Sequence, residues 1–178
     1  LLKQNTEILL PFWLEIVNLS LEEGSMDCLK NAVIFPLIKD LSATVDKDNL
    51  KNYQPVSNLL FISKLIQRIV SDRLDEYMKK NSLHSSNQYG YKNCHSTESI
   101  MLIVVDNLLI GCDKNSASVV LLLDLGAAFD TVDHQKLLKI LQHDLGITGT
   151  ALKWFHSFLT NRTFRVKIGD SYSNVMSL

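Results

Sequence analysis

Apolar residues recur at helical spacing in five stretches of the chain. They predict helices over residues 4–23, 59–80, 97–112, 134–145 and 149–159. Residues that favour helix ends flank most of these stretches. Gly24 and Gly146 are suited to end the first and fourth helices, and Asp133 is suited to begin the fourth. Ser57 or Asn58 is expected to cap the second helix, and Ser96 or Thr97 the third.

Shorter apolar or alternating runs predict strands between these helices. Residues 32–38 form such a run, and Pro36 within it indicates a strand at the edge of a sheet. Residues 118–124 contain an unbroken apolar run and predict a buried strand, and 53–56 are expected to be extended. The C-terminal residues alternate around Gly169, which predicts a closing hairpin. The fold class is therefore α+β (mixed α/β), with helices packed on a small sheet.

Composition narrows this picture in three ways. At 178 residues, with 46% hydrophobic and 21% charged residues, the chain is typical of one globular domain. A net charge of −1 argues against a stand-alone nucleic-acid-binding protein, although local patches can override the sum. The three cysteines have no zinc-type spacing, and no apolar run is long enough to predict a membrane span.

Asp124 stands directly after the apolar run Val119–Leu123. A carboxylate at such a place costs several kcal/mol unless it is paired or binds a metal ion. Ligands of open α/β sheets gather at the carboxyl ends of strands, and magnesium prefers carboxylates together with phosphate oxygens. Asp124 is therefore a candidate metal ligand. The alternative is that it caps the following turn or pairs with a lysine.

Three classes of phosphate-handling protein place an acid at the end of an apolar strand. A Walker-type ATPase needs G-x-x-x-x-G-K-[ST] upstream, which this chain lacks. A phosphatase with an aspartyl nucleophile would carry a second aspartate where this chain has Gly126. The third class is the palm of a polymerase, in which a bulky residue near the first acid contacts the sugar.

Five ordered motifs favour the third class. The stretch "LLLDLGAAFDTVDHQKLL", which contains Asp124, closely resembles the first catalytic motif of non-LTR (LINE-type) retrotransposon reverse transcriptases. The other four motifs also resemble segments of that family, in the same order. Their sequences are most similar to the CR1/L2/Jockey branch of the family. They read "LKNAVIFPLIKD", "NYQPVSNLLFISKLIQRIV", "NQYGYKNCHSTES" and "LGITGTALKWFHSFLTNRTFRVKIG".

The resemblance implies a role for residues around Asp124. It makes Asp124 the first catalytic, metal-binding carboxylate of a polymerase that uses two Mg²⁺ ions, and it gives the backbone carbonyl of Leu125 to the second ion. Phe129 resembles the steric gate that excludes ribonucleotides, and a rigid aromatic ring suits a discrimination between two sugars that differ by one hydroxyl. Packing in the core is the alternative for Phe129.

The resemblance also implies contacts to nucleotide and template. Lys39 and Gln54 match positions that face the incoming nucleotide, although the family usually has arginine at the position of Gln54. Gln88, Gly90 and Lys92 match a loop that contacts the template. A solvated lysine at a strand end is the alternative for Lys39. Asp130 and Asp133 are expected to be turn and capping groups, with metal ligation as the alternative, and His134 is expected to be structural. Trp154 and Phe155 are expected in the core, with stacking on bases as the alternative.

The resemblance implies template-directed DNA synthesis on RNA. The partners expected are an RNA template, a DNA primer and dNTPs, and no membrane. The location expected is intracellular, either nuclear or cytoplasmic. The domains expected are a pre-polymerase helical segment over 1–30 and a partial reverse transcriptase domain over 31–178, comprising the fingers and the first part of the palm. The family needs three acids, and its adjacent Asp-Asp pair is absent from this sequence. We therefore expect the chain alone to be inactive. The alternative is a non-catalytic retroelement relic that binds RNA or protein, which scattered basic residues and a near-neutral charge do not favour.

Overall fold

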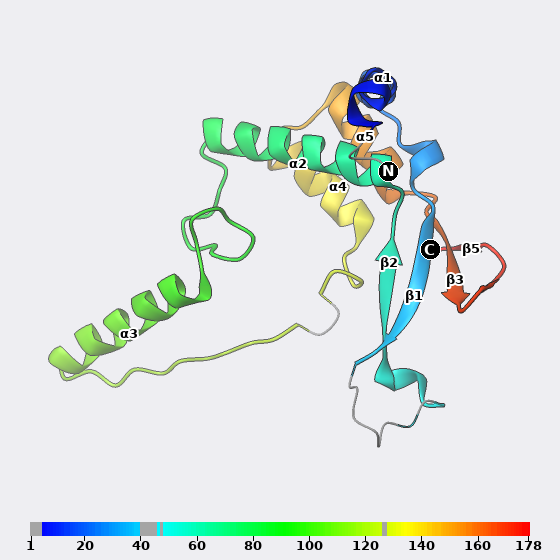
Figure 1. Ribbon diagram of the computed structural model, residues 1–178. Coiled ribbons are helices and arrows are strands. Elements are labelled where there is room, and N and C mark those ends of the chain that lie inside the picture. Colours follow the sequence, from blue (N-terminus) through cyan, green and yellow to red (C-terminus); the bar gives the residue numbers. More distant parts are fainter. Residues whose placement is uncertain (1–4, 40–45, 47, 126–127) are drawn as a thin grey trace. The chain divides into compact units, whose positions relative to one another are not determined.

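Residues 5–39, 46, 48–125 and 128–178 are described by a computed structural model. Gly126 lies outside these residues. The chain divides into two compact units, shown in Figure 1: a first unit of Leu1–Glu76 with Asp133–Leu178, and a second unit of Tyr77–Val132. The mixed α/β fold class expected from the sequence is confirmed.

A small mixed sheet lies in the first unit. Its central strand β1 (Ala32–Ile38) pairs antiparallel with β2 (Tyr53–Asn58) and parallel with β3 (Thr163–Ile168). On its other side, β3 pairs antiparallel with β4 (Ser171–Tyr172) and β5 (Met176–Ser177). The predicted closing hairpin is confirmed, because β3 and β4 are joined through Gly169, whose φ of 58° is readily adopted by glycine.

The prediction that β1 is an edge strand is wrong, because β1 has a partner on each side. Pro36 is tolerated there because the pairing of β1 with β3 covers only Ala32–Ile34 and stops short of it. On the other side Pro36 lies opposite Pro55, so two residues without an amide proton face one another. The amide proton that Pro36 lacks is therefore not needed for the pairing of β1 with either neighbouring strand.

The predicted helices are confirmed. The first unit holds α1 (Thr6–Glu23), α4 (His134–His143) and α5 (Gly149–Leu159), together with most of α2 (Phe61–Lys80), and two 3₁₀ turns, η2 (Asp27–Leu29) and η3 (Leu50–Asn52). Gly24 ends α1 with a left-handed φ of 62°, and the carboxylate of Asp133 accepts from the first amides of α4. The expected cap of α2 is wrong, because Ser57 and Asn58 belong to β2.

The core of the first unit forms around Trp154 of α5. Val17, Met26 and Ile66 pack in the same cluster, and Ile66 is fully buried. Phe158 stacks on Trp154 with ring centroids 5.3 Å apart. A second cluster comprises Leu138, Leu141 and Ile147. The core position expected for Trp154 is confirmed, and Phe155 packs half-buried against both clusters.

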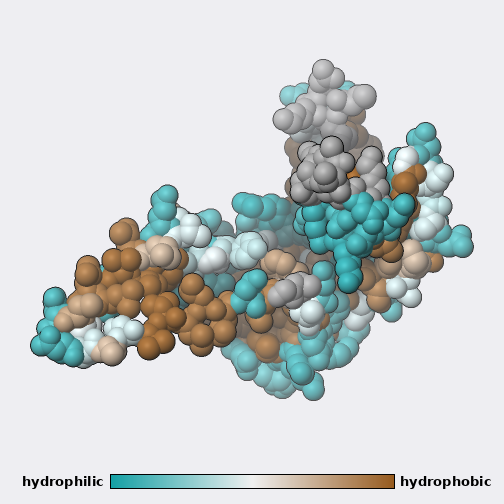
Figure 2. Space-filling model, turned by 90° about the horizontal axis from the view of Figure 1, so that it is seen from below, coloured by the Kyte–Doolittle hydropathy of each residue, from teal (hydrophilic) through white to brown (hydrophobic). Residues whose placement is uncertain are grey.

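The second unit is built on α3 (Thr97–Asp113). Ser96 caps it as predicted, in a reciprocal capping box with Ser99. The helix is largely apolar, yet none of its residues is buried. Its apolar side chains gather with those of 119–123 on an exposed surface of this unit, part of which Figure 2 shows in brown.

The predicted buried strand over 118–124 is wrong. The segment has no strand partner in the described part of the chain, and Val119, Leu122 and Leu123 are 93%, 87% and 82% exposed. An apolar run forms a strand only where neighbouring strands supply backbone hydrogen-bond partners. Every paired strand among the described residues lies in the first unit, whereas this segment belongs to the second. No helix within the described residues is long and apolar enough to cross a membrane.

Candidate functional site

Asp124 lies in the exposed segment of the second unit, and its side chain is exposed. Its carboxylate forms no hydrogen bond or ion pair with any residue that the structure describes. A turn cap or a lysine partner for Asp124 is not seen among the described residues, which leave out 126 and 127. Leu125 is 79% exposed. The carboxylate of Asp124 is thus accessible to an ion or a substrate from outside.

A metal site needs several ligands that lie close together. Over the described ranges, no group of three or more histidine, cysteine, aspartate or glutamate side chains is arranged to hold a metal ion. A two-metal centre needs several carboxylates to hold both ions in geometry for in-line attack. Asp124 is the carboxylate that the sequence predicts for it. The residues present therefore do not fit a complete two-metal centre, and no catalytic step follows from them alone.

Phe129 is exposed and is in contact with another aromatic ring. Its ring lies 5.9 Å from that of Tyr91, centroid to centroid, at an interplanar angle of 77°. Phe129 is 75% exposed and Tyr91 95% exposed. Neither ring belongs to a hydrophobic core cluster. The structure therefore places Phe129 at a surface, where core packing does not account for it.

The loop before α3 carries the three residues predicted to contact template. Gln88 Nε2 donates to the carbonyl of Gly90 at 3.3 Å, and Lys92 Nζ lies 3.5 Å from the carbonyl of Ser85. Gly90 has open space where a Cβ would lie, so packing does not require glycine there. Gln88 and Gly90 are exposed and Lys92 is half-buried. The loop is thus tied together by its own side chains and leaves polar atoms at the surface.

Lys39 and Gln54 lie at the same end of the β1–β2 pair in the first unit. Gln54 is opposite Leu37 in the register, and the amide of Lys39 donates to the carbonyl of Asn52 at 2.9 Å. Lys39 Nζ also donates to the carbonyl of Lys51 at 3.0 Å. Both side chains are exposed. The structure therefore brings these two predicted nucleotide-binding residues together.

The predicted site residues fall into two groups by unit. Lys39 and Gln54 belong to the first unit, and the other six belong to the second. Their assembly into one site stays a prediction. Tyr91 was not among the residues singled out from the sequence, although an aromatic residue between Gly90 and Lys92 in a polar loop is a signal that could have found it.

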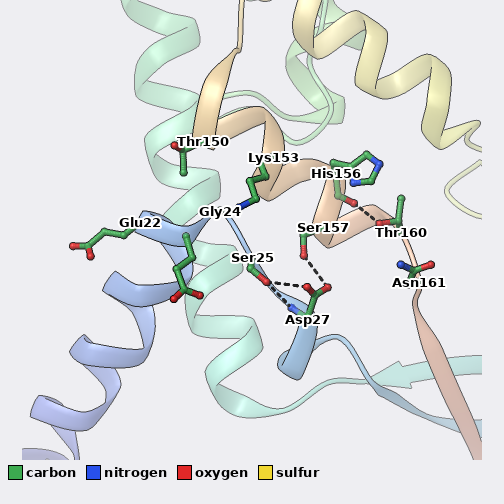
Figure 3. A pocket seen from close by; sticks show the side chains of 11 residues that line it. Glu22, Gly24, Ser25, Asp27, Thr150, Lys153, His156, Ser157, Thr160 and Asn161 are labelled. Atoms are coloured by element: carbon green, nitrogen blue, oxygen red, sulfur yellow. Dashed lines mark hydrogen bonds between the residues drawn. The ribbon is translucent and has the colours of Figure 1, made fainter.

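A polar pocket of about 510 Å³ lies elsewhere in the first unit, between the end of α1 and one face of α5 (Figure 3). Asp27 in its wall accepts hydrogen bonds from Lys30, Ser25 and Ser157, and Lys30 contributes most to a pKa of Asp27 below its ordinary value. These bonds join the segment after α1 to α5, so the acid serves the fold. The pocket contains none of the predicted site residues, and its lining comprises Glu22, Glu23, Gly24, Ser25, Asp27, Thr150, Lys153, His156, Ser157, Thr160 and Asn161.

Most of this chain is similar in sequence to known proteins. The family model described as "Reverse transcriptase (RNA-dependent DNA polymerase)" matches residues 45–176, a range that holds every predicted site residue except Lys39. Three relatives come from Drosophila melanogaster. The probable RNA-directed DNA polymerase from transposon BS is 26% identical over 71% of this chain and 14% of its own length. The probable RNA-directed DNA polymerase from transposon X-element is 30% identical over 68% of this chain and 13% of its own length. The RNA-directed DNA polymerase from mobile element jockey is 28% identical over 82% of this chain and 15% of its own length. The chain thus spans about one seventh of the relatives that it matches.

Proposed function

Because this chain belongs to the reverse transcriptase family, we propose that it supplies the fingers and the first palm motif of an RNA-directed DNA polymerase. The resemblance to non-LTR retrotransposon enzymes is confirmed by the matched family and by relatives from mobile elements. The observation that carries the proposal is the place of Asp124. It lies inside the matched range, at the end of an apolar run, with an accessible carboxylate.

Each group of residues has a part in this proposal. Asp124 contributes one carboxylate to a divalent-metal centre, Mg²⁺ in the cell, and Leu125 contributes its backbone carbonyl. Phe129 crowds a 2′-hydroxyl and so disfavours ribonucleotides. Lys39 and Gln54 contact the incoming nucleotide, whereas Gln88, Gly90 and Lys92 contact the template backbone without reading its sequence. When bound, the metal ions stabilise the charge that develops during phosphoryl transfer.

The assignment of Asp124 can be tested on the chain as it is. Mn²⁺ is a paramagnetic substitute for Mg²⁺ and broadens the NMR signals of nearby amides. We expect it to broaden the amides around residue 124 in the wild-type chain, and Asp124→Asn to abolish this effect. Asp130→Asn is a matched control, because Asp130 is a nearby exposed acid with no proposed metal role. Broadening that survives Asp124→Asn and disappears in Asp130→Asn would refute the assignment.

A second candidate function is a non-catalytic module that binds RNA. The lack, among the described residues, of a group of three or more metal-ligating side chains favours it, because a lone carboxylate does not complete a two-metal centre. The two candidates differ in their dependence on divalent metal. A binding module should hold single-stranded RNA equally well in Mg²⁺ and in EDTA, with affinity reduced by Lys92→Gln and unaffected by Asp124→Asn. Fluorescence anisotropy with a labelled RNA oligonucleotide measures both effects.

A further inference from the structure

Two exposed aromatic rings of the second unit meet edge to face. Tyr91 comes from the loop before α3, and Phe129 comes 38 positions later, after the segment that carries Asp124. Their centroids lie 5.9 Å apart at 77°, which is the arrangement that the quadrupoles of two aromatic rings favour. Both rings stay largely in contact with solvent. The two rings are therefore in contact while both remain exposed.

The backbone of Tyr91 indicates that its position is held at some cost. Its φ is +59°, in the left-handed region that bulky side chains rarely adopt. Within the loop, Gln88 donates to the carbonyl of Gly90 at 3.3 Å, and Lys92 makes a long contact of 3.5 Å with the carbonyl of Ser85. Strained residues persist where their surroundings determine them, and they cluster at functional sites. The residue with this unusual backbone conformation is therefore the one whose ring lies against Phe129.

We propose that Tyr91 is a positioning residue for Phe129: its ring holds the gate aromatic in the orientation that excludes a ribose 2′-hydroxyl. This inference rests on the gate role given to Phe129 in the proposed function. A steric filter discriminates only if it is rigid, because a ring that can rotate away leaves room for the larger sugar. Phe129 is exposed and belongs to neither hydrophobic core cluster, so core packing does not restrict its ring. Tyr91 supplies the missing contact from a separate part of the chain.

The chain of 178 residues can be tested with dATP and ATP in the presence of Mg²⁺. The dissociation constants of the two nucleotides come from NMR chemical-shift titrations, and their ratio measures sugar discrimination. We expect the wild-type chain to prefer dATP and Phe129→Ala to lose that preference. Tyr91→Leu should reduce the preference by about two- to tenfold, the range that one aromatic pair supports.

Two further variants separate positioning from a general loss of loop structure. Tyr91→Phe retains the ring and should retain the wild-type ratio. Tyr89→Leu removes an aromatic residue from the same loop, but that ring lies against His95, with centroids 5.0 Å apart, so the ratio should also be retained. Spectra of the remaining amides report whether each variant is folded.

The outcomes distinguish the inference from the function on which it rests. If Phe129→Ala loses the preference and Tyr91→Leu keeps it, the positioning role is overturned and the gate stands. If Tyr89→Leu loses as much as Tyr91→Leu, the effect belongs to the loop as a whole and the positioning role is again overturned. If the wild-type chain shows no preference, or binds neither nucleotide, the gate role fails and the inference fails with it.

Discussion

The indole Nε1 of Trp154 donates a hydrogen bond of 3.1 Å to the hydroxyl of Ser20, a residue 134 positions earlier in the chain. Both residues are buried. The same hydroxyl donates to the carbonyl of Ser25, so it is satisfied as donor and as acceptor. This one side chain therefore ties α1 to α5 and closes the turn that follows α1.

Ser20→Ala should destabilise the first unit. It leaves the buried N–H of Trp154 without an acceptor, and an unsatisfied buried donor costs about 1–3 kcal/mol. Urea denaturation followed by tryptophan fluorescence measures the loss. Ser71→Ala is the matched control, because Ser71 lies in the same unit and its side chain is exposed. Equal stability of the two variants would show that the bond from Trp154 contributes nothing.

Gly24→Ala should be more harmful than Gly169→Ala. Both glycines have a positive φ, 62° and 58°, so an alanine at either position carries a similar backbone cost of about 1–2 kcal/mol. At Gly24 the added Cβ would also lie 2.8 Å from the carbonyl oxygen of Thr150, whereas at Gly169 nothing lies within 4 Å. The difference between the two unfolding free energies isolates the clash between α1 and α5. A larger loss at Gly169 would contradict this packing.

Asp27 should make stability depend on pH in the acid range. Lys30 first, then Ser25 and Ser157, hold the pKa of Asp27 below its ordinary value of 3.8. The unfolded chain therefore binds this proton at higher pH than the folded chain does. The stabilisation is complete above the unfolded pKa and is lost as pH falls through the folded pKa. Urea midpoints measured between about pH 5 and pH 2 should fall less steeply in Asp27→Asn than in the wild type.

A second substitution checks the origin of that slope. Lys30 is 5% exposed, so Asp27→Asn also leaves a buried ammonium group with a weaker partner. Adding Lys30→Met removes that charge and should recover part of the stability at pH 7 while keeping the shallow slope, because an apolar residue can replace one member of a dismantled ion pair. A steep slope in this double variant would assign the acid sensitivity to other groups.

The cap of α4 should tolerate asparagine and not alanine. The carboxylate of Asp133 accepts from the amides of Gln135 and Lys136 at 2.9 and 3.0 Å. The bond from Lys136 is the largest cause of a pKa of Asp133 below its ordinary value. The amide oxygen of asparagine can accept the same bonds at every pH. Thermal unfolding should rank the wild type close to Asp133→Asn and above Asp133→Ala at pH 7, and an equal midpoint for Asp133→Ala would exclude a capping role.

Local chemistry explains which parts of the fold could be predicted from the sequence. Helical spacing and the end residues Gly24, Ser96 and Asp133 act within a few positions of themselves, so the helices and these caps were predicted correctly. The place of β1 depends on β3, which follows 130 residues later, so Pro36 alone suggested an edge. The segment 118–124 has the composition of a strand, but a strand also needs partners, which no property of the segment itself supplies.

The candidate site divides in the same way. The resemblance of the motif around Asp124 implies a metal ligand at Asp124 and a sugar gate at Phe129, and both roles stay predictions. The contact of Tyr91 with Phe129 arises from how the loop before α3 folds, which the motif pattern does not encode. The neighbouring positions of Lys39 and Gln54 follow from the pairing register of β1 and β2, which the sequence left open.

The unpaired segment around Asp124 has a thermodynamic consequence. Within the described residues no backbone hydrogen bond joins 118–125 to another segment, so an ion that binds Asp124 must also bear the entropy of ordering this backbone. That entropy costs about 1–2 kcal/mol for each residue fixed. Strands that pair with the segment would meet this cost in advance and tighten ion binding. By reciprocity, a bound ion would favour strand pairing by the same free energy.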